Sequence, residues 1–216
     1  MRLRDHRAGR GVPGWATLRA VKGDQEFLNR ATRDAEIKAA WVTEPPRLDG
    51  TVTLAEYDPN WPLLFDREEL RIRATLGSTV LRLEHTGSTS VPGLAAKPVV
   101  DMLLVVPDSS DEAMYVLPLE AAGYRLVIRE PEWNEHRVFK GPDTNINLHV
   151  LTTGSPEIER ILGFRDWLRS HDDDRLRYEA TKRELAARSW AYIQNYADAK
   201  SEVVESIIAE ARAALG

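Results

Sequence analysis

The sequence predicts an α/β (α+β) fold in which strands and helices alternate first and a helical region closes the chain. Three observations lead to this prediction. Short alternating segments and helical segments follow one another from Thr51 to about residue 151. Within them, Lys97–Val106 contains a continuous apolar run, which is typical of a central strand buried on both faces. After Pro156 the spacing of apolar residues is helical almost to the C-terminus.

The first 50 residues differ from the rest of the chain in how regularly their apolar residues are spaced. Residues 1–24 contain glycine and proline and little periodicity, and residues 25–41 could form a short helix that ends before Pro45-Pro46. Regular patterning starts at Thr51. We therefore expect residues 1–50 to be a basic, partly disordered extension and residues 51–216 to be the domain, with a helical part at 157–214.

The charge is unevenly placed. Residues 1–22 carry six Lys or Arg and a single acid, Asp5, whereas the whole chain has a formal net charge of −5. A basic arm before an acidic body can bind nucleic acid or an acidic partner. It lacks the interleaved aromatic residues of a nucleic-acid platform, so we favour a solvated extension and do not expect nucleic acid as a partner.

The elements of the domain follow in order. Thr51–Tyr57 alternates like a short strand. Asp58-Pro59 is typical of a helix N-cap followed by proline at the first helical position, and the helix should run to about Leu76. Further strands are expected at 79–84, 97–106, 124–128, 137–140 and 146–151. Further helices are expected at 109–122, 157–170, 174–196 and 198–214.

Composition excludes several classes of protein. The chain has 216 residues and no cysteine, so disulfides, thiolate metal sites and a cysteine nucleophile are excluded. No apolar run reaches the eighteen residues of a membrane span, and the N-terminus lacks the apolar stretch of a secretory signal. We expect a cytoplasmic protein with no membrane partner. The oligomeric state cannot be predicted.

Asp101 is the most unusual residue of the predicted central strand. It interrupts the apolar sequence from Val99 to Val106, where an unpaired carboxylate would be costly. It should therefore have a metal ion, a cation or a hydrogen-bond donor as its partner. A salt bridge to Lys97 or to an arginine of the helical region is the structural alternative to a functional site.

A turn rich in small residues, His85–Gly93, precedes this strand. Its Gly87, Ser88, Thr89 and Ser90 could bring backbone N–H groups and hydroxyls close to a phosphate. Such a turn alone is a weak signal.

A polar strand face and several inward cations complete the candidate site. Asn145, Asn147 and His149 share one face of a strand, which could line a site or meet solvent at an edge. Arg165, Lys182 and Lys200 fall on the apolar stripes of three helices. Cations placed in this way suggest an anion site between sheet and helices, with a structural ion-pair network as the alternative.

Several segments closely resemble the GrpB family. The most specific is Gly87–Leu94 (Gly-Ser-Thr-Ser-Val-Pro-Gly-Leu), and the resemblance covers about residues 55–214. The other matching segments are 57–62, 84–86, 96–101, 147–150, 164–169 and 196–200. The family is similar to the nucleotidyltransferase superfamily, and it is also found fused behind dephospho-CoA kinase in some bacteria. The resemblance implies a nucleotidyltransferase-like mixed sheet flanked by helices.

The resemblance also implies a chemistry. In that superfamily a Gly-Ser turn precedes a strand with two carboxylates that hold magnesium for nucleotidyl transfer. Gly87-Ser88 and Asp101 match, but the next alternate position is Leu103, so the second carboxylate is missing. Asn147 and His149 stand where a third acid often sits. This departure puts ordinary two-metal transfer in doubt.

The leading hypothesis is an enzyme that binds ATP or another NTP with Mg²⁺. It would transfer a nucleotidyl group to a small-molecule acceptor, or adenylate a carboxylate for ligation. Asp101 would be a catalytic metal ligand, and His149 a metal ligand or general base. The residues expected to bind nucleotide or phosphate are Gly87, Ser88, Thr89, Ser90, Lys97, Arg137, Arg165, Lys182 and Lys200. The alternatives are an inactive domain that binds a nucleotide or CoA-type ligand, and an interaction module that uses the basic arm.

Overall fold

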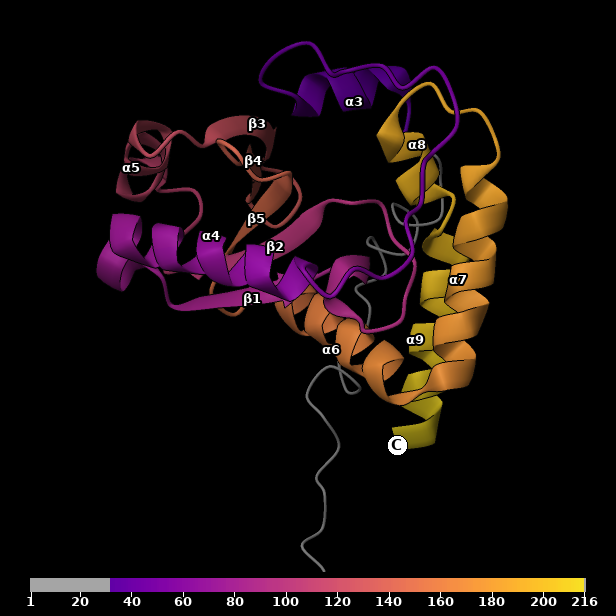
Figure 1. Cartoon of the computed structure of the whole chain (residues 1–216). Coiled ribbons are helices and arrows are strands. Elements are labelled where there is room, and N and C mark those ends of the chain that lie inside the picture. Colours follow the sequence, from indigo (N-terminus) through magenta and orange to yellow (C-terminus); the bar gives the residue numbers. More distant parts are fainter. Residues whose placement is uncertain (1–31, 216) are drawn as a thin grey trace, which may run out of the picture.

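The computed structural model describes residues 32–215 and shows a mixed five-stranded sheet between two groups of helices (Figure 1). The strands are β1 (Arg82–Thr86), β2 (Val100–Val106), β3 (Arg125–Glu130), β4 (His136–Lys140) and β5 (Ile146–Thr152). The α-helices are α3 (Asp34–Ala40), α4 (Trp61–Leu76), α5 (Val116–Ala121), α6 (Pro156–Ser170), α7 (Asp172–Ala186), α8 (Ile193–Asp198) and α9 (Ser201–Leu215). Three short 3-10 helices are η1 (Gly77–Thr79), η2 (Ser88–Ser90) and η3 (Glu112–Met114). The predicted fold class is confirmed.

The sheet has the order β1-β2-β5-β4-β3, with only the β2–β5 pair parallel. The register places Asp101 directly between Thr86 on β1 and Asn147 on β5. Lys140 on β4 lies opposite Asn147. A row of polar residues therefore crosses four strands on one face of the sheet.

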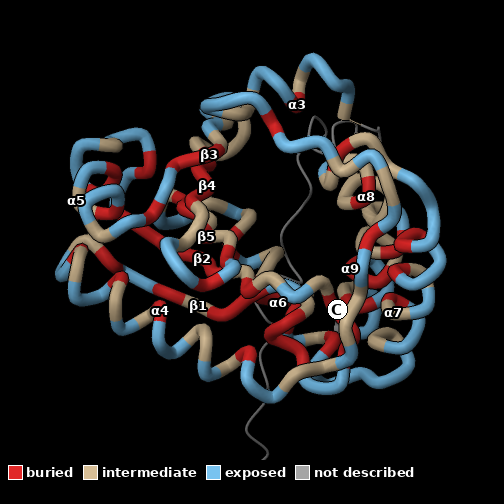
Figure 2. The backbone as a smooth tube through the Cα atoms, turned by 45° about the horizontal axis from the view of Figure 1, so that its top comes forward, coloured by how far each residue is buried: buried red, intermediate tan, exposed pale blue. Residues whose placement is uncertain are grey.

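The two faces of the sheet are covered differently. Helices α4 and α5 pack on one face, and the main core lies there, with Ile72, Met102 and Leu148 fully buried. On the other face, α6 covers only one end, through Ile158 and Leu162. The rest of that face carries the polar row and faces helices α7, α8 and α9. Figure 2 shows the buried residues concentrated along the strands.

Residues 32–50 pack onto the domain as a strap between the two groups of helices. Near its middle, Val42 N donates to Val127 O on edge strand β3 over 3.0 Å. Toward its two ends, Thr32 N donates to Asp198 Oδ2 on α8 and Leu48 N donates to Ala191 O just before α8, both over 2.8 Å. The strap is mostly exposed and crosses the opening between sheet and helices (Figures 1 and 2). The proposed boundary at residue 51 stays a prediction, and residues 1–31, which contain the basic arm, lie outside the described residues.

Two predicted strands and one helix start differ from the structure. Residues 51–57 form no strand and make only the isolated bridge Ala55–Ala96. The backbone of Val52 instead donates to Ala186 O on α7, and the side chains of Val52 and Leu54 pack against the C-terminal helices. Helix α4 begins two residues later than predicted, since the Asp58 carboxylate accepts from Asn60 and shapes the turn before the helix. Strand β1 is shifted toward the C-terminus, because η1 occupies the start of the expected 79–84 segment.

The predicted helix at 174–196 is interrupted. Trp190 leaves the helical path and exchanges backbone hydrogen bonds with Gly50, over 2.9 and 3.3 Å. This pairing separates α7 from α8. The expected helix at 109–122 is likewise two short pieces, η3 and α5. Of the helix expected at 25–41 the structure shows α3, and its earlier residues are not described. No helix within residues 32–215 is long and apolar enough to cross a membrane.

Candidate anion and metal site

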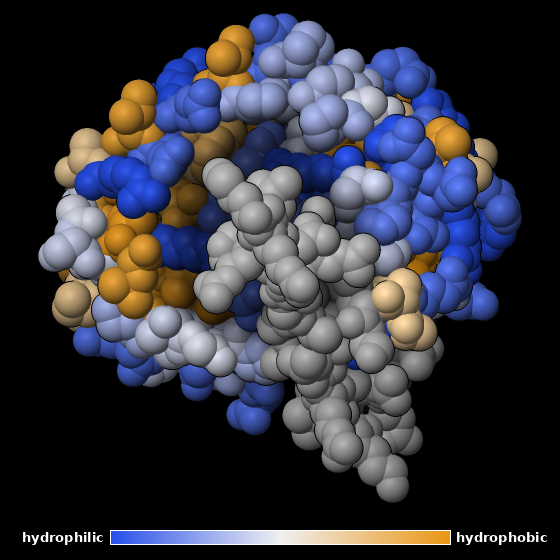
Figure 3. Space-filling model, turned by 90° about the horizontal axis from the view of Figure 1, so that it is seen from below, coloured by the Kyte–Doolittle hydropathy of each residue, from blue (hydrophilic) through white to orange (hydrophobic). Residues whose placement is uncertain are grey.

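A cavity of about 520 Å³ lies between the uncovered part of the sheet and the C-terminal helices. Its lining has a polar half, from η2, the loop before β2, strands β2, β4 and β5, α7 and the loop after α8, and a mostly apolar half, from the strap, β3, β4 and α8. Seen from below, the molecule is hollowed, and hydrophilic residues are visible in the hollow (Figure 3). The apolar half includes Ile37, Trp41, Pro45, Leu48, Ile128 and Val138.

Four lysines line the polar half: Lys97, Lys140, Lys182 and Lys200. Lys182 is 2% exposed and donates to Ser88 Oγ over 3.1 Å and to the carbonyl of Ala95. The ammonium groups of Lys97 and Lys200 lie 5.8 and 4.8 Å from the centre of the Tyr196 ring. In the part of the chain that the structure describes, no carboxylate lies within 4.0 Å of any of these four ammonium groups.

The pKa values of these lysines reflect the absence of a nearby anion that would compensate their positive charges. Burial, followed by repulsion from Lys200, lowers the pKa of Lys182 to about 7 and that of Lys97 to about 8. Burial also lowers the pKa values of Lys140 and Lys200, although the Asp101 carboxylate opposes both shifts. The lysines are therefore held together at a cost that a bound anion would relieve.

Asp101 is the one carboxylate among the described lining residues. Its Oδ1 accepts from Asn147 Nδ2 over 2.7 Å, and Asn147 Oδ1 accepts from Lys140 over 2.5 Å. Burial would raise the pKa of Asp101, but His149, Lys97 and Asn147 together hold that pKa below its usual value. The side chain stays 30% exposed toward the cavity, so the carboxylate is charged and available to a ligand.

Gly87 makes the position of Asp101 possible. Its φ of 64° and ψ of −173° belong to a region that essentially only glycine adopts. A Cβ on Gly87 would also lie 2.9 Å from the Asp101 Cβ, with the carboxylate closer still. Glycine is therefore required here for both its backbone conformation and its lack of a side chain.

The other residues of the predicted phosphate cradle divide into two groups. Ser88 and Thr89 line the cavity. Ser90 Oγ instead donates to the carbonyl of Gly87 over 2.6 Å and closes the turn. His85 lies on the opposite face of β1, where burial lowers its pKa to about 4 and its Nε2 pairs with Thr89 Oγ1 at 3.0 Å. Both Ser90 and His85 hold the shape of the turn.

Two predicted phosphate cations do not line the cavity. Arg165 is bound to Glu84 over 2.8 Å and to the carbonyl of His85 over 2.9 Å, which joins α6 to β1. Arg137 points to the other face of β4, where it donates to Glu112 over 2.7 Å. Both guanidinium groups have acidic partners, so the structure assigns them to packing between elements.

His149 joins the site through partners that the sequence did not indicate. Its Nε2 lies 3.8 Å from Asp101 Oδ1, and its Nδ1 lies 3.0 Å from Nε2 of His136. The other ring nitrogen of His136 lies 2.7 Å from Glu130 Oε2. Burial lowers the pKa of His136, although Glu130 opposes the shift. Lys140 was also missed, although it lies on the same strand face as His136 and Val138.

The residues fit magnesium only in part. Mg²⁺ prefers six oxygen ligands in near-octahedral geometry. The cavity offers the oxygens of Asp101, and Leu103 occupies the position of a second carboxylate. Within residues 32–215 no group of three or more His, Asp or Glu side chains is arranged to hold a metal ion. A metal here would need most of its ligands from a bound substrate and water.

Comparison with known proteins identifies the family. The family model described as GrpB protein matches residues 51–210. The UPF0157 protein BH1888 of Halalkalibacterium halodurans is 57% identical over 180 residues, which cover 83% of this chain and 92% of that protein. The crystal structure of the conserved protein GrpB from Enterococcus faecalis superposes with a TM-score of 0.66 at 31% identity, covering 75% of this chain and 98% of that one.

A more distant relative is a longer protein. The dephospho-CoA kinase of Mycolicibacterium paratuberculosis is 30% identical over 175 residues, which cover 69% of this chain but only 43% of that protein. The matched region and the identity to the first relative leave no doubt about the assignment: the chain belongs to the GrpB family.

Proposed function

We propose that the cavity binds a nucleoside triphosphate and that the protein transfers the nucleotidyl group to a small-molecule acceptor, or adenylates a carboxylate for ligation. The observation that carries this proposal is the set of four lysines around Asp101 that have no carboxylate within 4.0 Å among residues 32–215. The negative charges of a triphosphate would compensate the positive charges of these lysines. The cavity volume of about 520 Å³ is also within the ordinary range of small-molecule sites.

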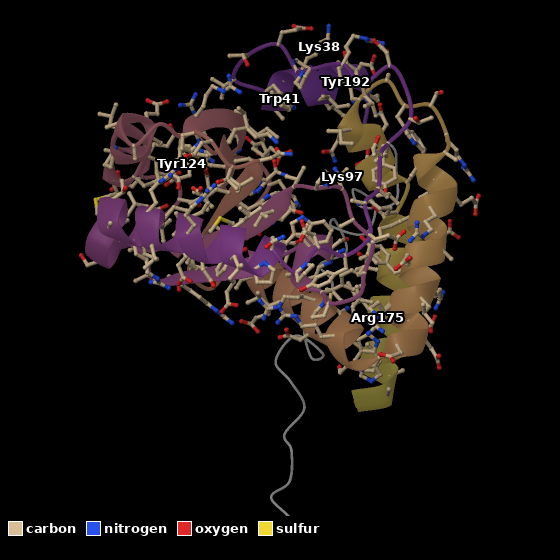
Figure 4. The ribbon with its side chains drawn as sticks, in the orientation of Figure 1. Lys38, Trp41, Lys97, Tyr124, Arg175 and Tyr192 are labelled. Carbon is tan, nitrogen blue, oxygen red and sulfur yellow. The ribbon has the colours of Figure 1, made fainter. Side chains whose placement is uncertain are left out.

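The two halves of the cavity suit the two parts of a nucleotide. Phosphate oxygens would meet Lys97, Lys182 and Lys200, whereas the base and sugar would meet the apolar strap. Figure 4 shows Trp41 and Tyr192 at the upper side of the opening and Lys97 on its wall. Tyr192 is held by Arg47, whose guanidinium carbon lies 5.1 Å from the ring centre, so its aromatic face has a defined orientation.

The reaction would be an in-line displacement. An oxygen of the acceptor would form a bond to the α-phosphorus while the bond to the bridging oxygen breaks and pyrophosphate leaves. The lysines would stabilise the charge that develops on this leaving group. The acceptor's proton would pass to Asp101, His149 or water. A Mg²⁺ ion bound to the nucleotide could take one oxygen of Asp101.

The experiment that tests binding is calorimetry with ATP, GTP, CTP and UTP, with and without Mg²⁺. We expect Lys97→Met and Lys200→Met to weaken binding at least about tenfold each, because charge-assisted hydrogen bonds in a partly buried site are strong. Lys38→Met is the matched control, since Lys38 on α3 is half exposed and paired with Glu44. No binding of any nucleotide, or equal losses in all three variants, would refute the proposal.

A second candidate function is favoured by Leu103, which replaces the second carboxylate. A domain without that carboxylate could bind a nucleotide or a CoA-type ligand and catalyse nothing. Adding CoA and dephospho-CoA to the binding panel, and measuring pyrophosphate release with a panel of acceptors, separates the two. Binding without pyrophosphate release, with Asp101→Asn weakening only the binding, would favour this candidate.

A further inference from the structure

Ser88 lies at the point where two cavities meet. Among the described residues it is the one that lines both the cavity described above and a second cavity of about 220 Å³. The second cavity lies between α6, α7 and α9, which pack together (Figure 1). Ser88 is the first residue of η2 and follows Gly87, whose φ of 64° turns the chain away from β1. A sharp turn between a strand and a helical segment is the arrangement that presents the nucleophile in many serine hydrolases.

The Ser88 hydroxyl contacts a lysine and a tyrosine of α7. Lys182 Nζ lies 3.1 Å from Ser88 Oγ and also donates to the carbonyl of Ala95. Tyr178, one turn earlier, hydrogen bonds with Ser88. Burial raises the pKa of Tyr178 to about 12, although the hydrogen bond with Ser88 opposes the shift, so the phenol keeps its proton. When Tyr178 donates to Ser88 Oγ, the proton of Ser88 is left to point to Lys182.

Lys182 can accept that proton once it has lost its own. Burial, followed by repulsion from Lys200, lowers its pKa to about 7, while Glu179 opposes the shift and Arg183 adds to it. A neutral amine has two N–H groups and one lone pair. One N–H group stays on the Ala95 carbonyl, and the lone pair faces Ser88. A desolvated lysine beside another cation is suited to act as a general base.

The second cavity is mostly apolar. Its apolar lining residues are Val91, Ile161, Phe164, Leu168 and Val204. Arg160 and Arg165 also line it, but both are paired with glutamates, so their charges are already compensated. Its volume of about 220 Å³ is smaller than that of most sites for a whole ligand and suits one apolar group of a larger substrate.

We propose that Ser88 is a nucleophile that takes an acyl group from an activated carboxylate, with Lys182 as its general base and the second cavity as the site of a short apolar acyl chain. The lysine-lined cavity and the second cavity then hold the two ends of one substrate, and Ser88 lies at the bond between them. The inference rests on the proposed function for one step: adenylation of the carboxylate in the first cavity would supply the acyl adenylate.

The acyl transfer is balanced by the groups at Ser88. Ser88 Oγ forms a bond to the carbonyl carbon while its proton passes to the Lys182 amine. The bond between that carbon and the phosphate oxygen then breaks, and AMP leaves with the electron pair. The new ammonium of Lys182 stabilises the negative charge of the leaving group. A hydroxyl or amine acceptor next attacks the ester of Ser88, Lys182 returns its proton to the Ser88 oxygen, and the proton of the acceptor goes to solvent.

The first test uses the full chain and a fluorophosphonate, which bonds to an activated serine oxygen and releases fluoride. We expect labelling at Ser88, located by peptide mass spectrometry, and its loss in Ser88→Ala. Ser170→Ala is the control, because Ser170 is exposed at the end of α6 and its hydroxyl donates to the Asp166 carbonyl. Labelling that persists in Ser88→Ala, or no labelling of the folded wild type, would overturn the proposal.

The second test isolates the general base. Lys182→Arg keeps the positive charge but cannot lose a proton, so labelling should slow by about a hundredfold. The wild-type rate should rise with pH up to a plateau above about 7, and Lys182→Arg should lack this rise. A purely structural contact between Lys182 and Ser88 would lower the melting temperature of the variant and leave the labelling rate of its folded fraction unchanged. If the variant does not fold, a wild-type rate that is flat between pH 6 and 8 refutes the role of Lys182.

The third test addresses the second cavity, with p-nitrophenyl butyrate and p-nitrophenyl acetate as acyl donors. Val204→Phe fills the cavity, so it should slow acyl transfer from the butyrate at least about tenfold and from the acetate less than about twofold. Equal losses for the two esters in a variant that melts like the wild type would remove the acyl chain from this cavity.

The outcomes separate this inference from the proposed function. Nucleotide binding without labelling of Ser88 would overturn the serine nucleophile and leave the nucleotide proposal intact. Labelling of Ser88 that depends on Lys182, in a protein that binds no nucleotide, would support the serine nucleophile and refute the nucleotide proposal.

Discussion

The sheet has a polar cluster on each face, and the two are built in opposite ways. On the covered face, Glu68 is 0% exposed and every partner is in place: Tyr124 donates to it over 2.6 Å, Thr144 donates to it, and Arg71 lies 3.5 Å away. On the open face, four lysines surround Asp101, and within the described part of the chain no carboxylate lies within 4.0 Å of their ammonium groups. A cluster whose charges are paired stabilises the fold, whereas charges that are hydrogen-bonded but not compensated are typical of a functional site.

The first prediction tests the covered cluster. Glu68→Ala should lower the free energy of unfolding by about 2–4 kcal/mol, because the Tyr124 and Thr144 hydroxyls lose a buried partner and a cavity opens. Nucleotide affinity should stay within about twofold in the folded fraction, since the cluster lies across the sheet from the site. Chemical denaturation checks the stability. Glu69→Ala, at a partly exposed position of the same helix, is the control and should cost less.

The second prediction tests the open cluster. Lys97→Met should weaken ATP binding at least tenfold, by about 1.4 kcal/mol, while the unfolding free energy of the protein without ligand stays unchanged or rises by about 0.5–1 kcal/mol. The reason is that methionine fills similar space without burying an uncompensated charge. Denaturation in parallel with calorimetry checks both values. A clear loss of stability would mean that Lys97 has a stabilising role in the free protein.

The third prediction concerns pH. The pKa of Lys182 falls to about 7 in the folded protein, below its unfolded value, so the unfolded chain binds more protons above pH 7. The stability contribution of this group should therefore rise as pH increases from about 7 toward 10, and ATP affinity should fall over the same range as the ammonium loses its charge. Comparison of the wild type with Lys182→Met isolates both slopes. Parallel slopes in the two proteins would contradict the assignment.

The smallest effect is expected for Arg137. Because its guanidinium pairs with Glu112 on the covered face, Arg137→Gln should change ATP affinity by less than about twofold and lower the stability by about 1–2 kcal/mol. Titration calorimetry and a thermal melt measure the two quantities. A large loss of binding would mean that phosphates reach beyond the cavity described here.

The sequence predicts much of the fold, because periodicity reports directly on buried faces. The strand 146–151 is one residue short of β5, and its alternation correctly separates Asn147 and His149 from the core residues Ile146 and Leu148. Pairings between distant segments are not visible in such patterns. The Trp190–Gly50 bridge, which interrupts the predicted helix at 174–196, is one example.

The same limit applies to the candidate site. Arg165, Lys182 and Lys200 were selected because each falls on the apolar stripe of a helix, and of these Lys182 and Lys200 line the cavity. Arg137 was also predicted as a phosphate-binding cation, but the two-residue period of β4 turns it away from His136 and Lys140. The contacts of Glu130 and His136 with each other and with His149 depend on the register of three strands, which no local pattern contains.

The strap at residues 32–50 has a practical consequence. The family match starts at residue 51, so a protein shortened to that boundary would keep all four lysines, Asp101 and His149 but lose Ile37, Trp41, Pro45 and Leu48 from the cavity lining. Binding to this shortened chain would separate the contributions of the phosphates and of the base. Inorganic tripolyphosphate should bind the shortened chain nearly as tightly as it binds the full chain, whereas ATP should bind it more weakly because the contacts to the base are lost. The strap would then be the part of the molecule that distinguishes a nucleotide from any other polyphosphate.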